Sequence, residues 1–314
     1  RSDGNNMSLG NAGAAAFGLP QLPDRQVTCN LRGKNKASSS AQALKIAYDF
    51  TDSLQLTSIT TRRVFDDDFT VDYDYSPATL QHNDKDNKYT TYSQELRLNS
   101  SGERLKWLVG LYYDYNHNEV NTIIDSDIPA MRKTRDREFK GNAYAAFGQA
   151  SYLFPWQVRL VIGLRYETQK MEFEDNISGA KLDNTWDDVS PKVALEYIFN
   201  PQVMTYVSAT KGYRSGGFNT FATDPQYYKY EEESLWSYEL GVKSTLLDKR
   251  LMINAAVFYM NIEDMQVSQA VPTDTVHVLT NAGQASATGC ELEVRAMPLK
   301  GLTLNGSVGY TDIK

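Results

Sequence analysis

The amino-acid sequence predicts an all-β protein, a transmembrane antiparallel up-and-down β-barrel with short turns at one end and long loops at the other. Three observations support this fold class. Short turns recur about every 50 residues, apolar and polar residues alternate between them, and aromatic residues gather near the ends of the expected strands. Barrel strands present alternate residues to lipid and to a wet lumen and carry aromatic girdles, so all three patterns are expected of them.

The turns are six short segments rich in Asp, Asn, Gly and Pro, residues that favour tight turns. They are Thr51 to Ser53, Ser101 to Glu103, Phe154 to Trp156, Asn200 to Gln202, Leu247 to Lys249 and Pro298 to Lys300. An interval of about 50 residues accommodates two strands of roughly 10 to 15 residues and one long loop. The spacing therefore predicts about 12 strands in this chain.

Long polar stretches lie between the turns, and they recur at one end of every hairpin only. They are Asp66 to Lys88, Asn121 to Arg137, Glu174 to Thr185, Ser215 to Glu233 and Gln269 to Asn281. Compact soluble domains rarely carry loops of this length, whereas outer-membrane barrels have short periplasmic turns and long extracellular loops. The polar residues 1–42 are predicted to be another extracellular loop.

The alternation predicts which side chains face lipid. Between Val158 and Tyr166 every second residue is apolar, and the intervening positions include Arg159 and Arg165. Arginines on the second face of a strand need water, so we expect that face to line a hydrated lumen. A soluble β-sandwich would also alternate, but its charged face would be outside and its loops would be short at both ends.

Composition excludes several classes of protein. The mean hydropathy is −0.49 and no run reaches the roughly 18 apolar residues of a membrane helix. The net charge is −7 and no Lys/Arg cluster follows one face, which argues against nucleic-acid binding. Cys29 and Cys290 lie far apart and imply no disulfide framework. We expect Cys29 in an external loop and Cys290 on the lipid face.

The sequence predicts no catalytic residue, no metal site and no cofactor, so the protein is not expected to be an enzyme. His82, His117 and His277 lie in or near three different loops and show no metal-ligand spacing. No nucleophile has a base and an orienting acid among its sequence neighbours. The carboxylates of Asp66 to Asp68 are typical of a solvated loop, which divalent ions near lipopolysaccharide could bridge.

The most specific motif is Lys211-Gly-Tyr-Arg-Ser-Gly-Gly-Phe-Asn219, which resembles the "GYRSGGFN" signature of TonB-dependent receptors. Three further segments resemble later strands of the same family. They are Tyr230 to Gly241, Ala256 to Gln266 with its "DMQ" ending, and Asn281 to Ala285 followed by Gly289 to Glu293. The chain is thus identified as similar to the barrel portion of a TonB-dependent outer-membrane receptor of the iron-complex type.

The resemblance implies a barrel of about 22 strands around an N-terminal plug, coupled to the TonB complex through an N-terminal box. No plug or box is visible, so residues 1–314 are expected to form a partial barrel domain in the outer membrane. The implied partners are a small-molecule ligand, outer-membrane lipid and lipopolysaccharide, and the TonB complex through the missing N-terminal region. The implied mechanism is capture by outer loops, binding by lumen and plug, and TonB-driven displacement of the plug.

The implied function is energy-dependent uptake of a scarce nutrient, with a ferric siderophore or other iron chelate expected first. Lys211 and Arg214 could attract an anionic chelate, while Tyr213 and Phe218 could stack on a planar one. The alternative is that these four residues only hold the loop together, with Gly216 and Gly217 supplying positive backbone dihedrals. Uptake of sugar or cobalamin, a passive porin-like channel, a barrel-embedded hydrolase and a soluble carbohydrate-binding protein also remain open.

Overall fold

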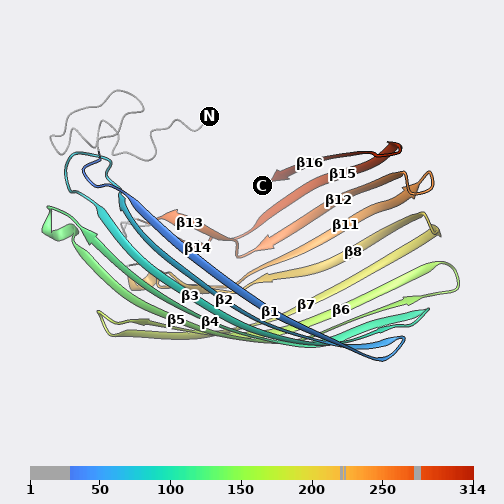
Figure 1. Ribbon diagram of the computed structural model, residues 1–314, viewed down its shortest axis with the longest axis horizontal. Coiled ribbons are helices and arrows are strands. Elements are labelled where there is room, and N and C mark those ends of the chain that lie inside the picture. Colours follow the sequence, from blue (N-terminus) through green and yellow to red (C-terminus); the bar gives the residue numbers. More distant parts are fainter. Residues whose placement is uncertain (1–28, 220–221, 223, 272–276) are drawn as a thin grey trace.

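Twelve antiparallel strands form one sheet, curved into a trough, in the computed structural model of the chain (Figure 1). The structure describes residues 29–314 except 220–221, 223 and 272–276. Sequential strands are neighbours throughout, as in an up-and-down barrel. The strands are β1 (Lys34–Thr51), β2 (Leu54–Asp72), β3 (His82–Ser101), β4 (Leu105–Asp125), β5 (Lys133–Leu153), β6 (Val158–Asp175), β7 (Ala180–Asn200), β8 (Val203–Arg214), β11 (Glu233–Leu246), β12 (Leu251–Glu263), β15 (Ala285–Leu299) and β16 (Leu302–Ile313).

The six connections on predicted turns gather at one end of the sheet and the other five at the opposite end (Figure 1), and four of these five are longer than any of the six. Each overlaps a turn that the sequence predicts, although some of the predicted turn residues still belong to the preceding strand, namely Thr51, Ser101, Asn200, Pro298 and Leu299. The longer connections carry two small sheets, β9 (Gly217–Phe218) with β10 (Lys229–Tyr230) and β13 (Gln266–Ala270) with β14 (His277–Asn281), and the 3-10 turns η1 (Pro129–Met131) and η2 (Pro225–Tyr227). Within the described ranges, no helix is long and apolar enough to span a membrane.

Three of the five predicted loops are shorter than the sequence predicts, because their strands continue beyond the apolar band, whereas the β8–β11 connection, 215–232, is nearly as predicted and the β12–β15 connection, 264–284, is longer. The β2–β3 connection is only 73–81 and the β6–β7 connection only 176–179. The predicted loop 1–42 is likewise wrong over residues 34–42, which belong to β1, and residues 1–28 lie outside the described part of the chain. The strand boundaries were predicted wrongly because the strand segments above the membrane are exposed to water and carry polar residues on both faces. These segments lack the apolar–polar alternation that marks a strand.

One face of the sheet is a continuous apolar surface. Cross-strand register places Ile162 of β6 beside Val193 of β7, and Leu195 beside Val207 of β8. Each of these four side chains is about half exposed, between 47% and 53%. Exposed tyrosines, including Tyr166, end this surface towards the loops. The sheet therefore has the apolar face that the alternation predicts, and the aromatic edge of this face has the form of an interfacial girdle.

The two cysteines allow a labelling experiment. Both are free and exposed, Cys29 beyond the outer end of β2 and Cys290 on the apolar face of β15 beside Val257. In intact cells, a polar maleimide should react with Cys29 and not with Cys290, because lipid is expected to cover Cys290. Mass mapping of labelled peptides checks this. Labelling of Cys290, or a disulfide between the two, would contradict the face assignment.

Candidate ligand-binding site

The barrel wall separates between β7 and β8 on the extracellular side, and this separation positions the signature motif. The two strands pair only as far as Lys192 and Thr210, whereas β7 continues to pair with β6 as far as Ala180. The first residue of β7 without a β8 partner is Pro191. Proline has no N–H to donate to a ladder, so pairing ends here and the end of β8 is free to turn away from β7.

The motif segment folds over the lumenal face of the sheet. Phe218 of β9 is 7% exposed and joins a cluster with Val120, Phe139, Phe173 and Trp186, which lie on β4 to β7. Its ring centroid is 5.9 Å from that of Phe173 and 6.0 Å from that of Trp186. Burial of aromatic rings in tilted and edge-on contacts is strongly favourable. The cluster therefore anchors the extracellular end of the motif across four strands.

The two glycines of the motif serve close packing rather than unusual backbone dihedrals. Neither has a positive φ, so that part of the sequence interpretation is wrong. A Cβ on Gly216 would lie 2.4 Å from Trp186 Nε1, and a Cβ on Gly217 would lie 2.5 Å from the Tyr230 hydroxyl oxygen. Both distances are shorter than the contacts of real Cβ atoms, so a side chain at either position would force a neighbouring group to move. A side chain at Gly216 would displace both the Trp186 ring and the Tyr230 backbone, whereas one at Gly217 would displace the end of the Tyr230 side chain.

Replacing Gly216 with alanine should loosen the motif segment. The new Cβ would force apart Trp186 and the Tyr230 carbonyl oxygen, which it would approach to 2.6 Å. Gly212→Ala is the matched control, because its nearest neighbour is a Leu235 methyl at 3.5 Å, an ordinary contact. Hydrogen exchange of residues 213–219 in the full-length receptor should rise in the first variant only. Equal exchange in both variants would contradict the packing argument.

Three amide side chains, in segments that carry the family resemblance, join the two long loops. Asn219 donates to the carbonyl oxygens of Tyr227 at 2.7 Å and Leu279 at 2.8 Å. Gln266 donates to the carbonyl oxygens of Ser215 at 2.9 Å and Glu231 at 3.0 Å. The third amide, Asn281, accepts from the Glu231 N–H at 2.8 Å. Residues up to 60 positions apart are thereby joined into one unit above the lumen.

Glu231 links several parts of this unit, and no sequence pattern predicted a role for it. Its carboxylate accepts a hydrogen bond from Trp186 Nε1 at 3.1 Å and pairs with Lys229 Nζ at 2.6 Å. The Lys229 ammonium and the Trp186 indole hold the pKa of Glu231 below its usual range. Trp186 thus packs on Gly216, contacts Phe218 and fixes Glu231. No local pattern in the sequence marks such a residue, because its partners lie on other strands and loops.

The four predicted ligand-binding residues occupy different environments. Lys211 is committed to an ion pair, with Nζ 2.6 Å from Asp188 Oδ1 across the gap between β8 and β7. Phe218 lies in the aromatic cluster, and Tyr213 packs against it. Burial raises the pKa of Tyr213 to about 12, and its hydroxyl has no hydrogen-bond partner among the described residues. Arg214 is exposed and makes no hydrogen bond or ion pair with the described chain.

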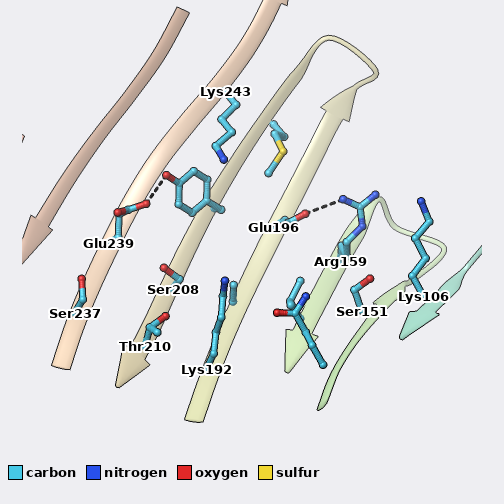
Figure 2. A pocket seen from close by; sticks show the side chains of 15 residues that line it. Lys106, Ser151, Arg159, Lys192, Glu196, Ser208, Thr210, Ser237, Glu239 and Lys243 are labelled. Atoms are coloured by element: carbon cyan, nitrogen blue, oxygen red, sulfur yellow. Dashed lines mark hydrogen bonds and ion pairs between the residues drawn. The ribbon is translucent and has the colours of Figure 1, made fainter. Parts of the chain in front are cut away.

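A cavity of about 500 Å³ lies on the lumenal wall below the motif (Figure 2). Its lining carries four cationic side chains, from Lys106, Arg159, Lys192 and Lys243, and two carboxylates. Arg159 pairs with one of these, Glu196, at 2.8 Å. The remaining lining is largely hydroxyl and amide groups. The lining of this cavity is therefore polar and carries more cations than carboxylates, and its charged side chains agree with the charged inward face that the alternation predicts.

Comparison with known proteins agrees with this architecture. The "Pesticin receptor" of Yersinia pestis is 27% identical over 230 residues, which is 68% of this chain and 33% of that protein. The solved ferric yersiniabactin uptake receptor FyuA of Yersinia pestis superposes with a TM-score of 0.74 at 21% identity, covering 89% of this chain and 43% of that one. The siderophore receptor PiuA of Acinetobacter baumannii gives 0.73 at 16% identity, covering 90% and 47%.

The chain spans about a third of the length of the curated relative and under half of the two solved receptors. The family model described as "TonB dependent receptor-like, beta-barrel" matches residues 2–314. The match and the twelve-stranded sheet with short turns at one end agree with the resemblance of the motif segments. The chain therefore belongs to the TonB-dependent receptor family of the bacterial outer membrane and forms part of its β-barrel domain.

Proposed function

We propose that the protein to which this chain belongs imports a scarce nutrient across the outer membrane by TonB-dependent uptake, and that its ligand is a ferric siderophore or another iron chelate. The observation that carries the proposal is the motif segment folded over the lumenal face, above a cavity whose lining has four cationic side chains and two carboxylates. The printed names of FyuA and PiuA, an uptake receptor for ferric yersiniabactin and a siderophore receptor, support the ligand class. Similar proteins act in transport rather than in catalysis, so a receptor is favoured over an enzyme.

Charge at the mouth and along the lumen favours an anionic ligand. Arg214 is the motif cation with an exposed side chain, so it is the side chain best placed to meet a ligand first. Below it, the cavity of Figure 2 lies on a wall with more cations than carboxylates. A low-dielectric, narrow passage strengthens attraction of an anion to such groups. Tyr213 and Phe218 act indirectly in this proposal. They do not contact the ligand, but they hold in place the segment that presents Arg214.

The outer surface of the barrel is proposed to contact lipopolysaccharide. Above the tyrosine girdle, lysines and glutamates alternate across β5, β6 and β7, and they pair closely, Lys140 with Glu138 at 2.9 Å and Lys181 with Glu174 at 2.6 Å. Phosphate groups of an anionic glycolipid lie at this height and can exchange into such pairs, either directly or through divalent ions. The TonB complex is proposed to engage a region of the protein outside this chain.

The test of the ligand proposal is growth of the parent organism under iron starvation on single ferric chelates. Arg214→Ala should reduce growth on one chelate because it removes the exposed cation, and Phe218→Ala should reduce it more because the motif segment loses its anchor. Lys170→Ala is the matched control, since Lys170 pairs with Glu172 on the outer face, away from the lumen. Surface expression is quantified for every allele.

Three outcomes would contradict the iron proposal and favour one of the alternative functions. Normal growth of a deletion strain on every ferric chelate, without induction by iron starvation, would point to cobalamin or a sugar. Uptake that persists after de-energising TonB would favour a passive porin-like channel. Hydrolysis of a lipid ester by the purified receptor would favour a barrel-embedded enzyme.

A further inference from the structure

The cavity of Figure 2 contains two lysines whose charge no neighbouring side chain neutralises. Lys106 of β4 and Lys192 of β7 line it, and neither makes a hydrogen bond or ion pair within the described part of the chain. The two carboxylates of the lining are committed elsewhere. Glu196 pairs with Arg159 at 2.8 Å, and Glu239 accepts a hydrogen bond from a tyrosine hydroxyl. The cavity therefore has positive charge that an anion could neutralise.

Backbone register shows that the two lysines flank β5 and β6. Lys106 is paired with Ser151 of β5, Ser151 with Val161 of β6, and Val161 with Ala194 of β7. Lys192 lies two residues from Ala194 along β7, so both belong to the lumenal face. Three strand intervals of about 4.8 Å separate β4 from β7, or roughly 14 Å. Two long side chains that start this far apart can reach towards each other and contact one small molecule between them.

Small residues leave the space between the two lysines open. Gly163 of β6 is paired with Lys192, and a Cβ added to Gly163 would meet its nearest atoms, Lys192 Cβ among them, only at 3.6 Å. Ser151 and Ala194 contribute short side chains to the cavity lining, and Gln149 contributes an amide. Hydroxyl and amide groups can donate hydrogen bonds to the oxygens of an anion. The floor therefore offers neutral donors between two cations.

The two lysines lie at the height of the bilayer. Lys192 alternates along β7 with Val193 and Leu195, which are about half exposed on the apolar face. Ionisable groups at this depth face water or a counter-charge and commonly mark the path of a substrate. On β8, Thr210 lines the cavity and Arg214 lies on the same face nearer the extracellular end. The lysines are thus placed below the exposed cation of the mouth.

The size of the cavity favours a small molecule as its occupant. Its volume of about 500 Å³ falls within the roughly 300 to 1,000 Å³ of small-molecule sites. One acidic side chain from another part of the receptor would fill little of this space. The hydroxyl and amide groups that accompany the cations suit carboxylate or phosphate oxygens, which accept several hydrogen bonds at once.

We propose that Lys106 and Lys192, with Ser151 and Gln149 between them, form an anion clamp that binds the ligand in transit by its carboxylate or phosphate groups. The clamp rests on the proposed uptake of an anionic ligand and adds a second binding station to it, at the height of the bilayer. Lysine suits such a station because its ammonium is a compact charge on a flexible stem, with three rotatable donors. It attracts an anion without the rigid geometry of a bidentate arginine contact.

Labelling of the purified, unmutated full-length receptor with pyridoxal 5′-phosphate tests the clamp. The phosphate of this probe is anionic, and its aldehyde forms an imine with a lysine amine, which borohydride reduces to a stable secondary amine. Lys106 and Lys192 should react at least about tenfold faster than Lys170, whose ammonium pairs with Glu172 on the outer face. Citrate should protect the two clamp lysines, whereas sodium chloride at equal ionic strength should protect them far less. Mass mapping quantifies each modified lysine.

Three labelling results would overturn the clamp. They are equal reactivity of Lys106, Lys192 and Lys170, equal protection by citrate and chloride, and complete resistance of Lys106 and Lys192 to the probe. The last result would mean that another part of the receptor covers the two lysines.

Uptake by cells separates the clamp from the proposed function. In a variant with both Lys106→Gln and Lys192→Gln, TonB-dependent uptake of ⁵⁵Fe from a chelate that the parent imports should fall. Binding of that chelate to cells without TonB should stay unchanged, because Arg214 at the mouth is intact. Lys170→Gln is the matched control and should import normally. Normal import by the double variant would contradict the clamp alone. If the parent imports no ferric chelate, the iron proposal fails and the labelling experiment decides the clamp by itself.

Discussion

Replacing Arg137 with alanine should destabilise the folded receptor by about 3 to 5 kcal/mol, the cost of leaving a buried ion unpaired. Arg137 Nε donates to Asp175 Oδ2 at 2.9 Å, and the two side chains are only 6% and 10% exposed. The guanidinium also lies over the Phe173 ring at 5.5 Å and donates to the Ala222 carbonyl oxygen at 3.3 Å. It therefore joins the aromatic cluster to the loop above it.

Denaturant unfolding of the full-length receptor in lipid vesicles measures this cost. The matched control is Lys170→Ala, which removes an exposed pair with Glu172 whose side chains are 48% and 52% exposed. Water and salt screen an exposed pair, so it contributes little to stability, and the control should unfold almost as the parent does. Equal losses in both variants would show that burial of the Arg137 pair does not matter.

The Arg137 pair also predicts a pH dependence. Burial raises the pKa of Asp175, but the Ser178 N–H and the Arg137 guanidinium outweigh it and hold the pKa below its usual value. A carboxyl with a depressed folded pKa contributes stability that is complete above its unfolded value of about 3.9 and is lost as pH falls through the folded value. The difference between the parent and Arg137→Ala should therefore be largest near neutral pH and shrink below about pH 4.

Arginine at Ile162 should cost roughly 2 to 4 kcal/mol if the site lies near the bilayer midplane. Ile162 is 53% exposed on the apolar face, so the charge would enter lipid. Gly163→Arg is the matched control on the lumenal face. A Cβ there has its nearest neighbours at 3.6 Å, an ordinary contact, and water can solvate the guanidinium. Gly163→Arg should therefore fold in nearly normal yield.

Folding yield in lipid vesicles separates the two arginine variants. The expected order is parent, then Gly163→Arg, then Ile162→Arg well below both. An equal yield for the two variants would contradict the assignment of Ile162 to the lipid face and Gly163 to the lumenal face. The proposed lumenal site depends on this assignment.

The strand pattern could be predicted from the sequence because it is local. Turns such as Asn200 to Gln202 carry their own chemistry, and the alternation around Ile162 needs no tertiary information. The strands above the membrane escaped prediction, as β1 shows by beginning at Lys34. Their side chains face water on both sides, so the polar sequence of an extended strand resembles that of a loop.

The candidate site was predictable only as a segment. The motif places Lys211 to Asn219 at the end of a strand. The residues that contact them, however, lie far away in the sequence, on other strands and loops. Phe218 is buried by β6 and β7, and Asn219 bonds to Leu279, 60 residues away. Likewise, the three histidines show no ligand spacing in sequence, yet folding brings His82 beside Asp72. Pairings between loops depend on barrel geometry, which local periodicity does not encode.

The most direct test of the account is uptake of radioactive iron by cells that lack or carry the gene for the full-length receptor. Cells are supplied with ⁵⁵Fe on a panel of chelates, with labelled cobalamin in parallel, in the presence and absence of TonB. The expected result is accumulation of ⁵⁵Fe from at least one chelate that requires both the receptor and TonB and falls in the Arg214→Ala and Phe218→Ala alleles. Receptor-independent accumulation from every chelate, or receptor-dependent uptake of cobalamin alone, would contradict it.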